Sequence, residues 1–178
     1  TSAEAEASRL SGMVANLLDM NRLEAGALPV RTAPAAPVDL VAHAIERATL
    51  ALADRRVEND VRPGGAAFMV DASLFQTALA NILENAGKYS PAGSAIRIRA
   101  GEDRRTGWIE VLDEGTGFPS AVEPLFEKFA RGVTGDGRPP GTGLGLTIAR
   151  GFIEAQGGRI GAANRTDHQG AIVRLVAP

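Results

Sequence analysis

The chain has 178 residues, of which 19 are Lys or Arg and 21 are Asp or Glu, so its formal net charge is only −2. This balance argues against a strongly basic nucleic-acid-binding protein. Hydrophobic residues make up 44% of the chain, enough for a good core, and the lack of cysteine excludes disulfides and thiolate metal sites. The longest stretch without a charge, 72–83, is shorter than the roughly 18 residues that span a bilayer, so we expect no membrane contact.

The first predicted element is a long helix over residues 3–25. No proline interrupts it, and apolar residues recur at three- and four-residue spacings: Leu10, Met13, Val14, Leu17, Leu18 and Met20. Such a stripe suits a helical hairpin or bundle. Gly26 is expected to end the helix, and three prolines within residues 29–37 indicate an extended linker before a globular domain. Because the sequence starts with Thr1 and reads as helix at once, we expect it to be a piece of a longer protein.

The remaining residues predict one α+β domain. We expect helices over 39–55, 71–88 and 146–156, with Asp71 as an N-cap, and strands over 57–61, 67–70, 95–100, 108–112, 159–163 and 171–176. The order is mixed, without a regular alternation of strand and helix. This predicts a two-layer sandwich in which helices cover one face of a sheet.

Two amides and a cation lie along one edge of the predicted helix 71–88. At about 100° per residue, Asn85 and Lys88 lie within about 40° of Asn81 around the helix axis, beside the apolar face. Asparagine oxygen is a hard ligand suited to Mg²⁺, and a lysine could neutralise phosphate. The same residues also fit a solvated helix face.

Asp113 directly follows a predicted strand and begins the sequence Asp-Glu-Gly115-Thr-Gly117. An ionised carboxylate only accepts hydrogen bonds, so it would favour a base with an exocyclic amine, such as adenine. The glycines would allow a close approach of the backbone. A tight turn without a ligand explains the same residues.

Residues 131–146 contain six glycines and a Pro-Pro pair, which predicts a long functional loop rather than a regular element. Its end, Gly141-Thr142-Gly143-Leu144-Gly145, opens a helix, and backbone amides there could bind an anion. Neither the dinucleotide-binding nor the P-loop pattern fits. Just upstream, Phe126 and Phe129 flank Lys128, and these rings could simply anchor the loop to the core.

The four segments in this order resemble the N, G1, F and G2 boxes of the histidine-kinase catalytic domain, a family related to gyrase, Hsp90 and MutL. The sequences 84–93, 125–132 and 163–165 are similar to potassium-responsive sensor kinases of the Kdp type. The resemblance implies a Bergerat-type ATP-binding fold over residues 38–178. It also identifies residues 1–28 as the second helix of the dimerisation and histidine-phosphotransfer hairpin, joined by a linker over 29–37.

The resemblance implies a role for each site residue. Asn85 would coordinate Mg²⁺, Asn81 would contact phosphate or a metal-bound water, and Lys88 would pair with phosphate. Tyr89 would pack near the adenine or ribose, and Asp113 would accept its amine in a pocket shaped by Gly115 and Gly117. The phosphates would be bound by the remaining residues: Lys128, Arg131, Gly141, Thr142, Gly143, Leu144 and Gly145.

The resemblance also favours a reaction type. Hydrolytic relatives place a glutamate where this chain has Asn81, and an amide cannot act as a general base. We therefore expect transfer of the γ-phosphoryl of ATP to a histidine, and then to the aspartate of a response regulator. His43 and His168 do not match the acceptor motif, so the acceptor is expected upstream of residue 1. Gly87 replaces a usual bulky aliphatic residue and could loosen the pocket.

Several expectations concern the parent protein. It would be a homodimer through its helical hairpins, anchored in the bacterial inner membrane, with this chain as a cytoplasmic domain that contacts no nucleic acid. An ATP-sensing domain without transferase activity is the alternative from a different class. A hydrolytic ATPase is disfavoured by Asn81.

Overall fold

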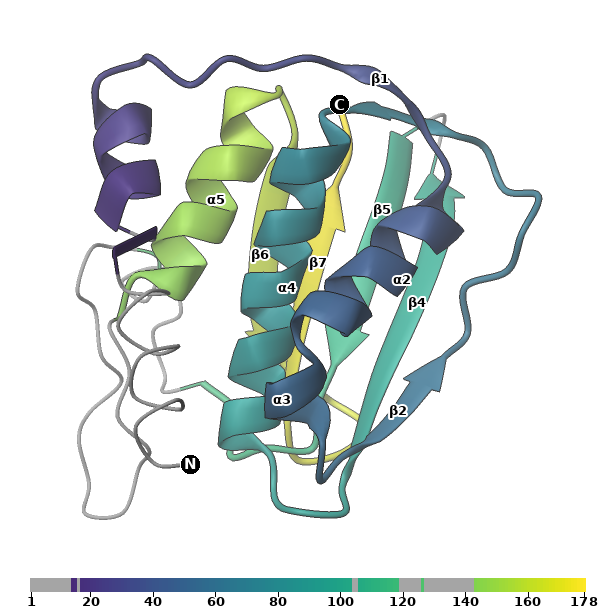
Figure 1. Ribbon diagram of the computed structural model, residues 1–178. Coiled ribbons are helices and arrows are strands. Elements are labelled where there is room, and N and C mark those ends of the chain that lie inside the picture. The colour runs from purple at the N-terminus through teal and green to yellow at the C-terminus, as the bar shows by residue number, and fades with distance from the viewer. Residues whose placement is uncertain (1–13, 16, 104–105, 119–125, 127–142) are drawn as a thin grey trace.

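Helices cover one face of a mixed five-stranded sheet (Figure 1). The computed structural model describes residues 14, 15, 17–103, 106–118, 126 and 143–178. The strand order is β2-β4-β5-β7-β6, with β2 parallel to β4 and the other pairs antiparallel. The sheet consists of β2 (Arg56–Asn59), β4 (Ala95–Asp103), β5 (Thr106–Leu112), β6 (Arg159–Asn164) and β7 (Ala171–Val176). After a helical segment over 17–24, the helices are α2 (Pro37–Arg47), α3 (Thr49–Leu52), α4 (Ala72–Tyr89) and α5 (Gly145–Ala155). The predicted α+β sandwich is confirmed.

The core lies between the sheet and α4. Alternate strand residues point to the helices and are at most 5% exposed: Ile96, Ile98, Ile109, Val111, Val173 and Leu175. The predicted apolar face of α4 meets them, and its members are all buried: Phe75, Leu79, Ile82, Leu83 and Ala86. The opposite face of the sheet carries ion pairs, including Arg99 to Glu110 at 2.9 Å. One solvated face and one buried face are typical of a largely antiparallel sheet.

Helix α4 begins as the sequence predicts. The Asp71 side chain accepts a hydrogen bond from the Leu74 backbone N–H at 3.2 Å, so Asp71 is the N-cap. Its other carboxylate oxygen accepts from the Arg31 N–H at 2.9 Å, which ties the preceding chain to this helix. The position of α4 is therefore fixed at its first turn.

The single helix expected over residues 39–55 is wrong. The structure has α2, which begins with Pro37 at its first turn, and a separate short α3, with a break at Ala48. The Thr49 hydroxyl donates to the carbonyls of Glu46 and Ile45, at 2.6 and 3.3 Å. A side chain that competes for helical carbonyls in this way disfavours continuation of the helix.

Gly87 has a packing role in this arrangement. It is buried in α4 where α3 crosses, and a Cβ there would lie 2.3 Å from the Ala51 carbonyl oxygen. Only a residue without a side chain allows this approach. The glycine thus lets α3 lie directly on α4, close to the end that carries Lys88 and Tyr89.

The predicted linker 29–37 contains a strand. β1 (Ala33–Ala35) pairs antiparallel with β3 (Phe68–Val70), and Pro34 lies opposite Met69. Periodicity could not reveal it, because proline is depleted in strands except at edges, and β1 is an edge.

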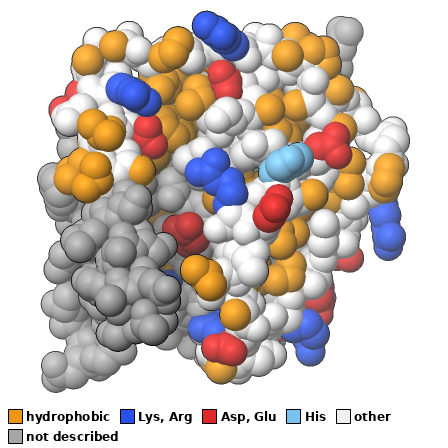
Figure 2. Space-filling view, viewed as in Figure 1, with side chains coloured by type: hydrophobic (Ala, Val, Ile, Leu, Met, Phe, Trp, Pro, Cys, Tyr) orange, Lys and Arg blue, Asp and Glu red, His pale blue; other side chains and the backbone are white. Residues whose placement is uncertain are grey.

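Residues 17–24 are helical, and Gly26 follows with a φ of +60°, as expected for a helix-ending glycine. Met20 is buried in the core. Leu23 packs against Gly151 of α5, and a Cβ at Gly151 would lie only 2.5 Å from Cδ1 of Leu23. Leu17 and Leu18 are about half exposed, and hydrophobic side chains show at the left of the space-filling view, where this segment lies (Figure 2). Among the described residues, no helix is both long enough and apolar enough to cross a membrane.

Candidate functional site along helix α4

Two asparagines of α4 meet the beginning of α5. A Cβ at Gly145, the first residue of α5, would lie 3.6 Å from Nδ2 of Asn85 and 4.0 Å from Oδ1 of Asn81. The structure thus brings together residues that are 60 or more positions apart in the chain. A solvated helix face is not the explanation for Asn81, because this residue is only 8% exposed.

Asn81 has a buried amide nitrogen without a partner. Its Nδ2 makes no hydrogen bond with any of the residues that the structure describes. A buried, unsatisfied donor is costly, and such groups mark functional sites or an absent ligand. A phosphate oxygen or a metal-bound water would satisfy it.

The residues here fit a magnesium ion shared with a phosphate better than a protein cage. The described part of the chain has no group of three or more His, Asp or Glu that could hold a metal. Mg²⁺ commonly keeps several waters and binds through few protein oxygens together with phosphate. Asn85 is the side chain that could supply such an oxygen.

Lys88 and Tyr89 are the last two residues of α4. The Lys88 Nζ lies 4.8 Å from the centre of the Tyr89 ring, a cation–π contact, and Tyr89 is 42% exposed. A large ring left open to solvent beside a cation can pack on a base or ribose.

Asp113 lies buried at the end of β5. Its Oδ1 accepts backbone hydrogen bonds from Gly115 at 2.8 Å and from Ala171 at 3.1 Å, while Oδ2 receives none from the described residues. Burial raises the pKa of the Asp113 carboxyl, and these two hydrogen bonds oppose that effect. The carboxylate is therefore held rigidly by one oxygen.

Close backbone and side-chain contacts require glycine at positions 115 and 117, just after Asp113. A Cβ at Gly115 would lie 2.7 Å from the Tyr89 carbonyl oxygen, so this residue joins the Asp113 segment to the end of α4. Gly117 has a φ of +74°, and a Cβ there would meet Oδ1 of Asn164 at 2.6 Å. Asp113, Gly115 and Tyr89 form one end of the candidate site, and Asn81 and Asn85, which meet Gly145 of α5, lie further back along α4.

The glycine-rich segment is described only from Gly143. Gly143 has a φ of +71°, and the Leu144 side chain is buried in the core at 2% exposure, so Leu144 could contact a ligand only through its backbone. Four predicted site residues lie outside the described residues: Lys128, Arg131, Gly141 and Thr142. Phe126 is described, and its buried ring packs under the Arg150 guanidinium at 4.2 Å, which supports the anchoring interpretation for this ring.

Both histidines are exposed and bonded locally. The Nδ1 of His43 lies 2.8 Å from the Asp39 carbonyl one turn earlier in α2, and that of His168 lies 2.9 Å from the Gln169 carbonyl. His43 belongs to α2 and His168 to the turn between β6 and β7, so neither lies on the helix that carries Asn81 and Asn85.

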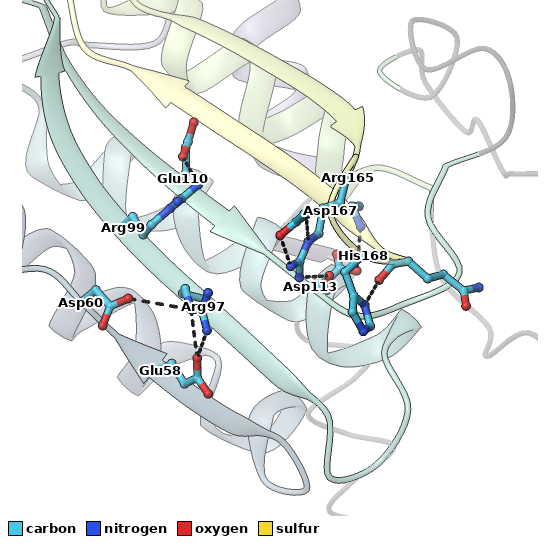
Figure 3. Close-up of polar contacts among 11 residues, drawn as sticks. Glu58, Asp60, Arg97, Arg99, Glu110, Asp113, Arg165, Asp167 and His168 are labelled. Atoms are coloured by element: carbon cyan, nitrogen blue, oxygen red, sulfur yellow. Dashed lines mark hydrogen bonds and ion pairs between the residues drawn. The ribbon is translucent and has the colours of Figure 1, made fainter.

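Sequence reasoning gave no role to the turn between β6 and β7, which contacts the Asp113 segment. Arg165 donates to the Asp113 carbonyl at 3.1 Å, and Figure 3 shows its guanidinium between Asp113 and Asp167. The same view shows Arg97 paired with Glu58 on the open face of the sheet. An Asn-Arg pair at a strand end carries no local signal for partners some 50 residues away.

A family model described as the histidine kinase-, DNA gyrase B- and HSP90-like ATPase matches residues 70–178. The sensor protein KdpD of Mycobacterium tuberculosis is 37% identical over an alignment of 190 residues, which covers 98% of this chain and 21% of that protein. KdpD of Escherichia coli is 34% identical over 167 residues, covering 93% and 18%. The chain thus spans about a fifth of the length of these relatives.

Solved structures are similar over most of the chain. The Acinetobacter baumannii histidine kinase AdeS matches with a TM-score of 0.78 and 23% identity, covering 99% of this chain and 81% of that one. The mycobacterial sensor histidine kinase MprB matches with a TM-score of 0.69 and 25% identity, covering 82% and 97%. Full-length ShkA, solved in complex with AMPPNP, matches with a TM-score of 0.78 and 26% identity, covering 98% and 36%.

Proposed function

Because the chain belongs to the family of histidine kinase-, DNA gyrase B- and HSP90-like ATPases, we propose that it is the ATP-binding catalytic domain of a bacterial sensor histidine kinase. The observation that carries this proposal is the meeting of Asn81 and Asn85 with the first residue of α5, about one and two turns of α4 back from the Tyr89 end that the Asp113 segment contacts. The similar structure of ShkA was solved in complex with AMPPNP, an ATP analogue, which supports a nucleotide as the ligand.

The pocket has a base end and a phosphate end. The Asp113 carboxylate would accept the adenine amine, and Tyr89 would pack against the base or ribose. Asn81 would donate its unpartnered Nδ2 to a phosphate oxygen, and Lys88 would neutralise phosphate charge. Transfer of a phosphoryl group needs positioning and charge neutralisation more than covalent help from the protein.

We also propose that Asn85 coordinates a magnesium ion. When bound, the ion would neutralise the charge that develops on the phosphate oxygens. Asn85 contributes one neutral oxygen, which leaves room for waters and phosphate. Lys128, Arg131, Gly141 and Thr142 are proposed to complete the phosphate end.

The acceptor is proposed to be a histidine upstream of residue 1, on a helix that pairs with residues 1–28 and dimerises the parent. From there the phosphoryl would pass to a response-regulator aspartate. The absence of a glutamate at position 81 supports transfer over hydrolysis, because an amide cannot activate water as a base. We propose a Kdp-type parent, potassium-responsive and anchored in the membrane with this domain in the cytoplasm.

Calorimetric titration of ADP, ATP and GTP into the chain, with and without Mg²⁺, tests the binding part. We expect adenine-selective binding that Mg²⁺ strengthens, and in Asn85→Ala we expect the effect of Mg²⁺ to disappear while adenine selectivity remains. Ser73→Ala, at an exposed position of the same helix, is the control. Absence of nucleotide binding by the folded wild type would reject the proposal.

A longer chain that includes the upstream helix tests the transfer. With γ-labelled ATP we expect an acid-labile phosphohistidine that still forms in the double variant His43→Ala and His168→Ala. Binding of ATP by this longer chain without any labelling would favour an ATP-sensing domain. Steady release of phosphate without labelled protein would favour a hydrolytic ATPase.

A further inference from the structure

The turn between β6 and β7 holds both ends of the segment 113–118. At the first end, Nη1 of Arg165 donates to the Asp113 carbonyl oxygen at 3.1 Å. The guanidinium is itself fixed by Asp167, whose two carboxylate oxygens accept from Nε and Nη2 at 3.0 and 2.9 Å. This pairing lowers the pKa of Asp167 to about 2. A bidentate arginine is held in one orientation, so the contact with Asp113 is a directed one.

At the second end, Asn164 pairs with the backbone of Phe118. Its Oδ1 accepts from the Phe118 N–H at 2.6 Å, and its Nδ2 donates to the Phe118 carbonyl at 3.0 Å. Gly117 lies so close to this amide that a Cβ would overlap it. Two opposed hydrogen bonds to one residue fix both the position and the rotation of that part of the chain.

Between these ends the turn touches Asp113 directly. A Cβ at Gly170 would lie 2.0 Å from the Asp113 carbonyl oxygen, and the adjacent Ala171 N–H is one of the two donors to Oδ1. The backbones of Asp113 and Ala171 are also bonded, N–H to carbonyl, at 3.0 Å. The Asp113 carboxylate therefore takes its direction from this turn as much as from β5.

From these contacts we infer that Asn164 and Arg165 are positioning residues for the base-binding end of the pocket, an inference that rests on the proposed function. Neither side chain is required to touch the nucleotide. Each holds the backbone whose orientation aims Asp113 at the base and sets the space between Gly115 and Tyr89. A displacement of about 1 Å in such a site is enough to weaken recognition strongly.

The test compares ligands that carry the same base and different numbers of phosphates. Dissociation constants of adenosine, AMP and ADP are measured by NMR titration for Arg165→Ala, Asn164→Ala and the wild type. Because the base end is disturbed, we expect each variant to weaken all three ligands by the same factor, about tenfold for the loss of one directed hydrogen bond. Asn85→Ala, at the phosphate end, should weaken Mg·ADP and leave adenosine unchanged.

Arg159→Ala is the matched control, because Arg159 is an exposed arginine at the opposite end of β6. We expect it to bind all three ligands as the wild type does. Arg165→Lys keeps a charged donor for the Asp113 carbonyl but cannot span both oxygens of Asp167, so it should restore part of the affinity. Amide hydrogen exchange should become faster at Phe118 in Asn164→Ala, and this readout does not depend on a ligand.

The outcomes separate this inference from the proposed function. A folded wild type that binds none of the ligands rejects the proposed function. A wild type that binds them, with Arg165→Ala and Asn164→Ala binding adenosine equally well, overturns the inference alone. If Arg165→Ala does not fold, Asp167→Asn decides instead. This substitution is at an exposed position and weakens the ion pair that orients the Arg165 guanidinium. Unchanged adenosine affinity in Asp167→Asn would contradict the role of Arg165.

Discussion

Gly145, the first residue of α5, faces the side-chain amide of Asn85 where α5 packs against α4, and a Cβ there would lie 3.6 Å from Nδ2. That distance is an ordinary van der Waals contact, so alanine fits, whereas a branched side chain would fill the space in front of the amide. The relationship gives a direct test of where the phosphates bind.

We expect Gly145→Val to weaken the binding of Mg·ATP by about 1–3 kcal/mol, the usual cost of overpacking. Gly145→Ala should bind nearly as the wild type does. Calorimetric titration measures both, and Gly161→Val is the control, since a Cβ at Gly161 meets nothing within 4 Å. Equal affinities for the valine and alanine variants would contradict this placement of the phosphates.

Asp113→Asn should separate stability from binding. The amide oxygen can still accept from Gly115 and Ala171, and no charge is buried, so we expect an unchanged or higher melting temperature. In the variant an amide nitrogen replaces Oδ2 and donates a hydrogen bond instead of accepting one. Adenine nucleotides should therefore bind more weakly by about 1.5–3 kcal/mol. Thermal melts and titrations with ADP and GTP measure the two effects. Asp103→Asn, at an exposed ion pair, should change neither.

The raised pKa of Asp113 predicts how the difference in stability between the wild type and Asp113→Asn depends on pH. Because the folded-state pKa is raised above the ordinary 3.8, burial of the charge costs stability above the folded pKa, and this cost is relieved as the pH falls through it. The stability advantage of Asp113→Asn over the wild type should therefore be largest near neutral pH and shrink in acid. Urea unfolding across this pH range measures it, and an advantage that grows in acid would show the opposite sign.

Adenine binding by the wild type should also weaken on acidification. A protonated Asp113 no longer offers a carboxylate to the exocyclic amine, so ADP affinity should fall as the pH approaches the raised pKa from above. The same titration of Asp113→Asn should show a smaller pH dependence, since only the ligand and the remaining groups titrate.

Gly87→Ala should destabilise the fold although alanine is the better helix former. The new Cβ would lie 2.3 Å from the Ala51 carbonyl oxygen, and a backbone atom of α3 cannot move without displacing the helix. We expect a loss of about 1–3 kcal/mol in unfolding free energy, which outweighs a helix-propensity gain of about 1 kcal/mol. Chemical denaturation measures it. Gly161→Ala, in open space, is the control, and an increase in stability for Gly87→Ala would contradict this packing.

Local patterns in the sequence predicted most helices and strands in their order, the apolar face of α4, its N-cap at Asp71 and the place of Asp113 at the end of a strand, but not β1. Each of these depends on residues a few positions apart, so periodicity and capping chemistry are sufficient to predict them. The order of the motifs also pointed to the family. The predicted helix 39–55 failed because the hydroxyl of Thr49 competes with the helical backbone, an effect that the apolar spacing does not contain.

Only the tertiary structure decided which distant residues meet. Phe118 is 46 residues from Asn164, and Asp113 is 52 residues from Arg165, so no local pattern relates them. Likewise the sequence presents Gly87 as a weak point in a helix, whereas the packing of α3 on α4 makes it the residue that allows the contact. Side chains of the nucleotide pocket can be proposed from sequence, but their direction is set by backbone contacts that form only when the sheet and helices have packed together.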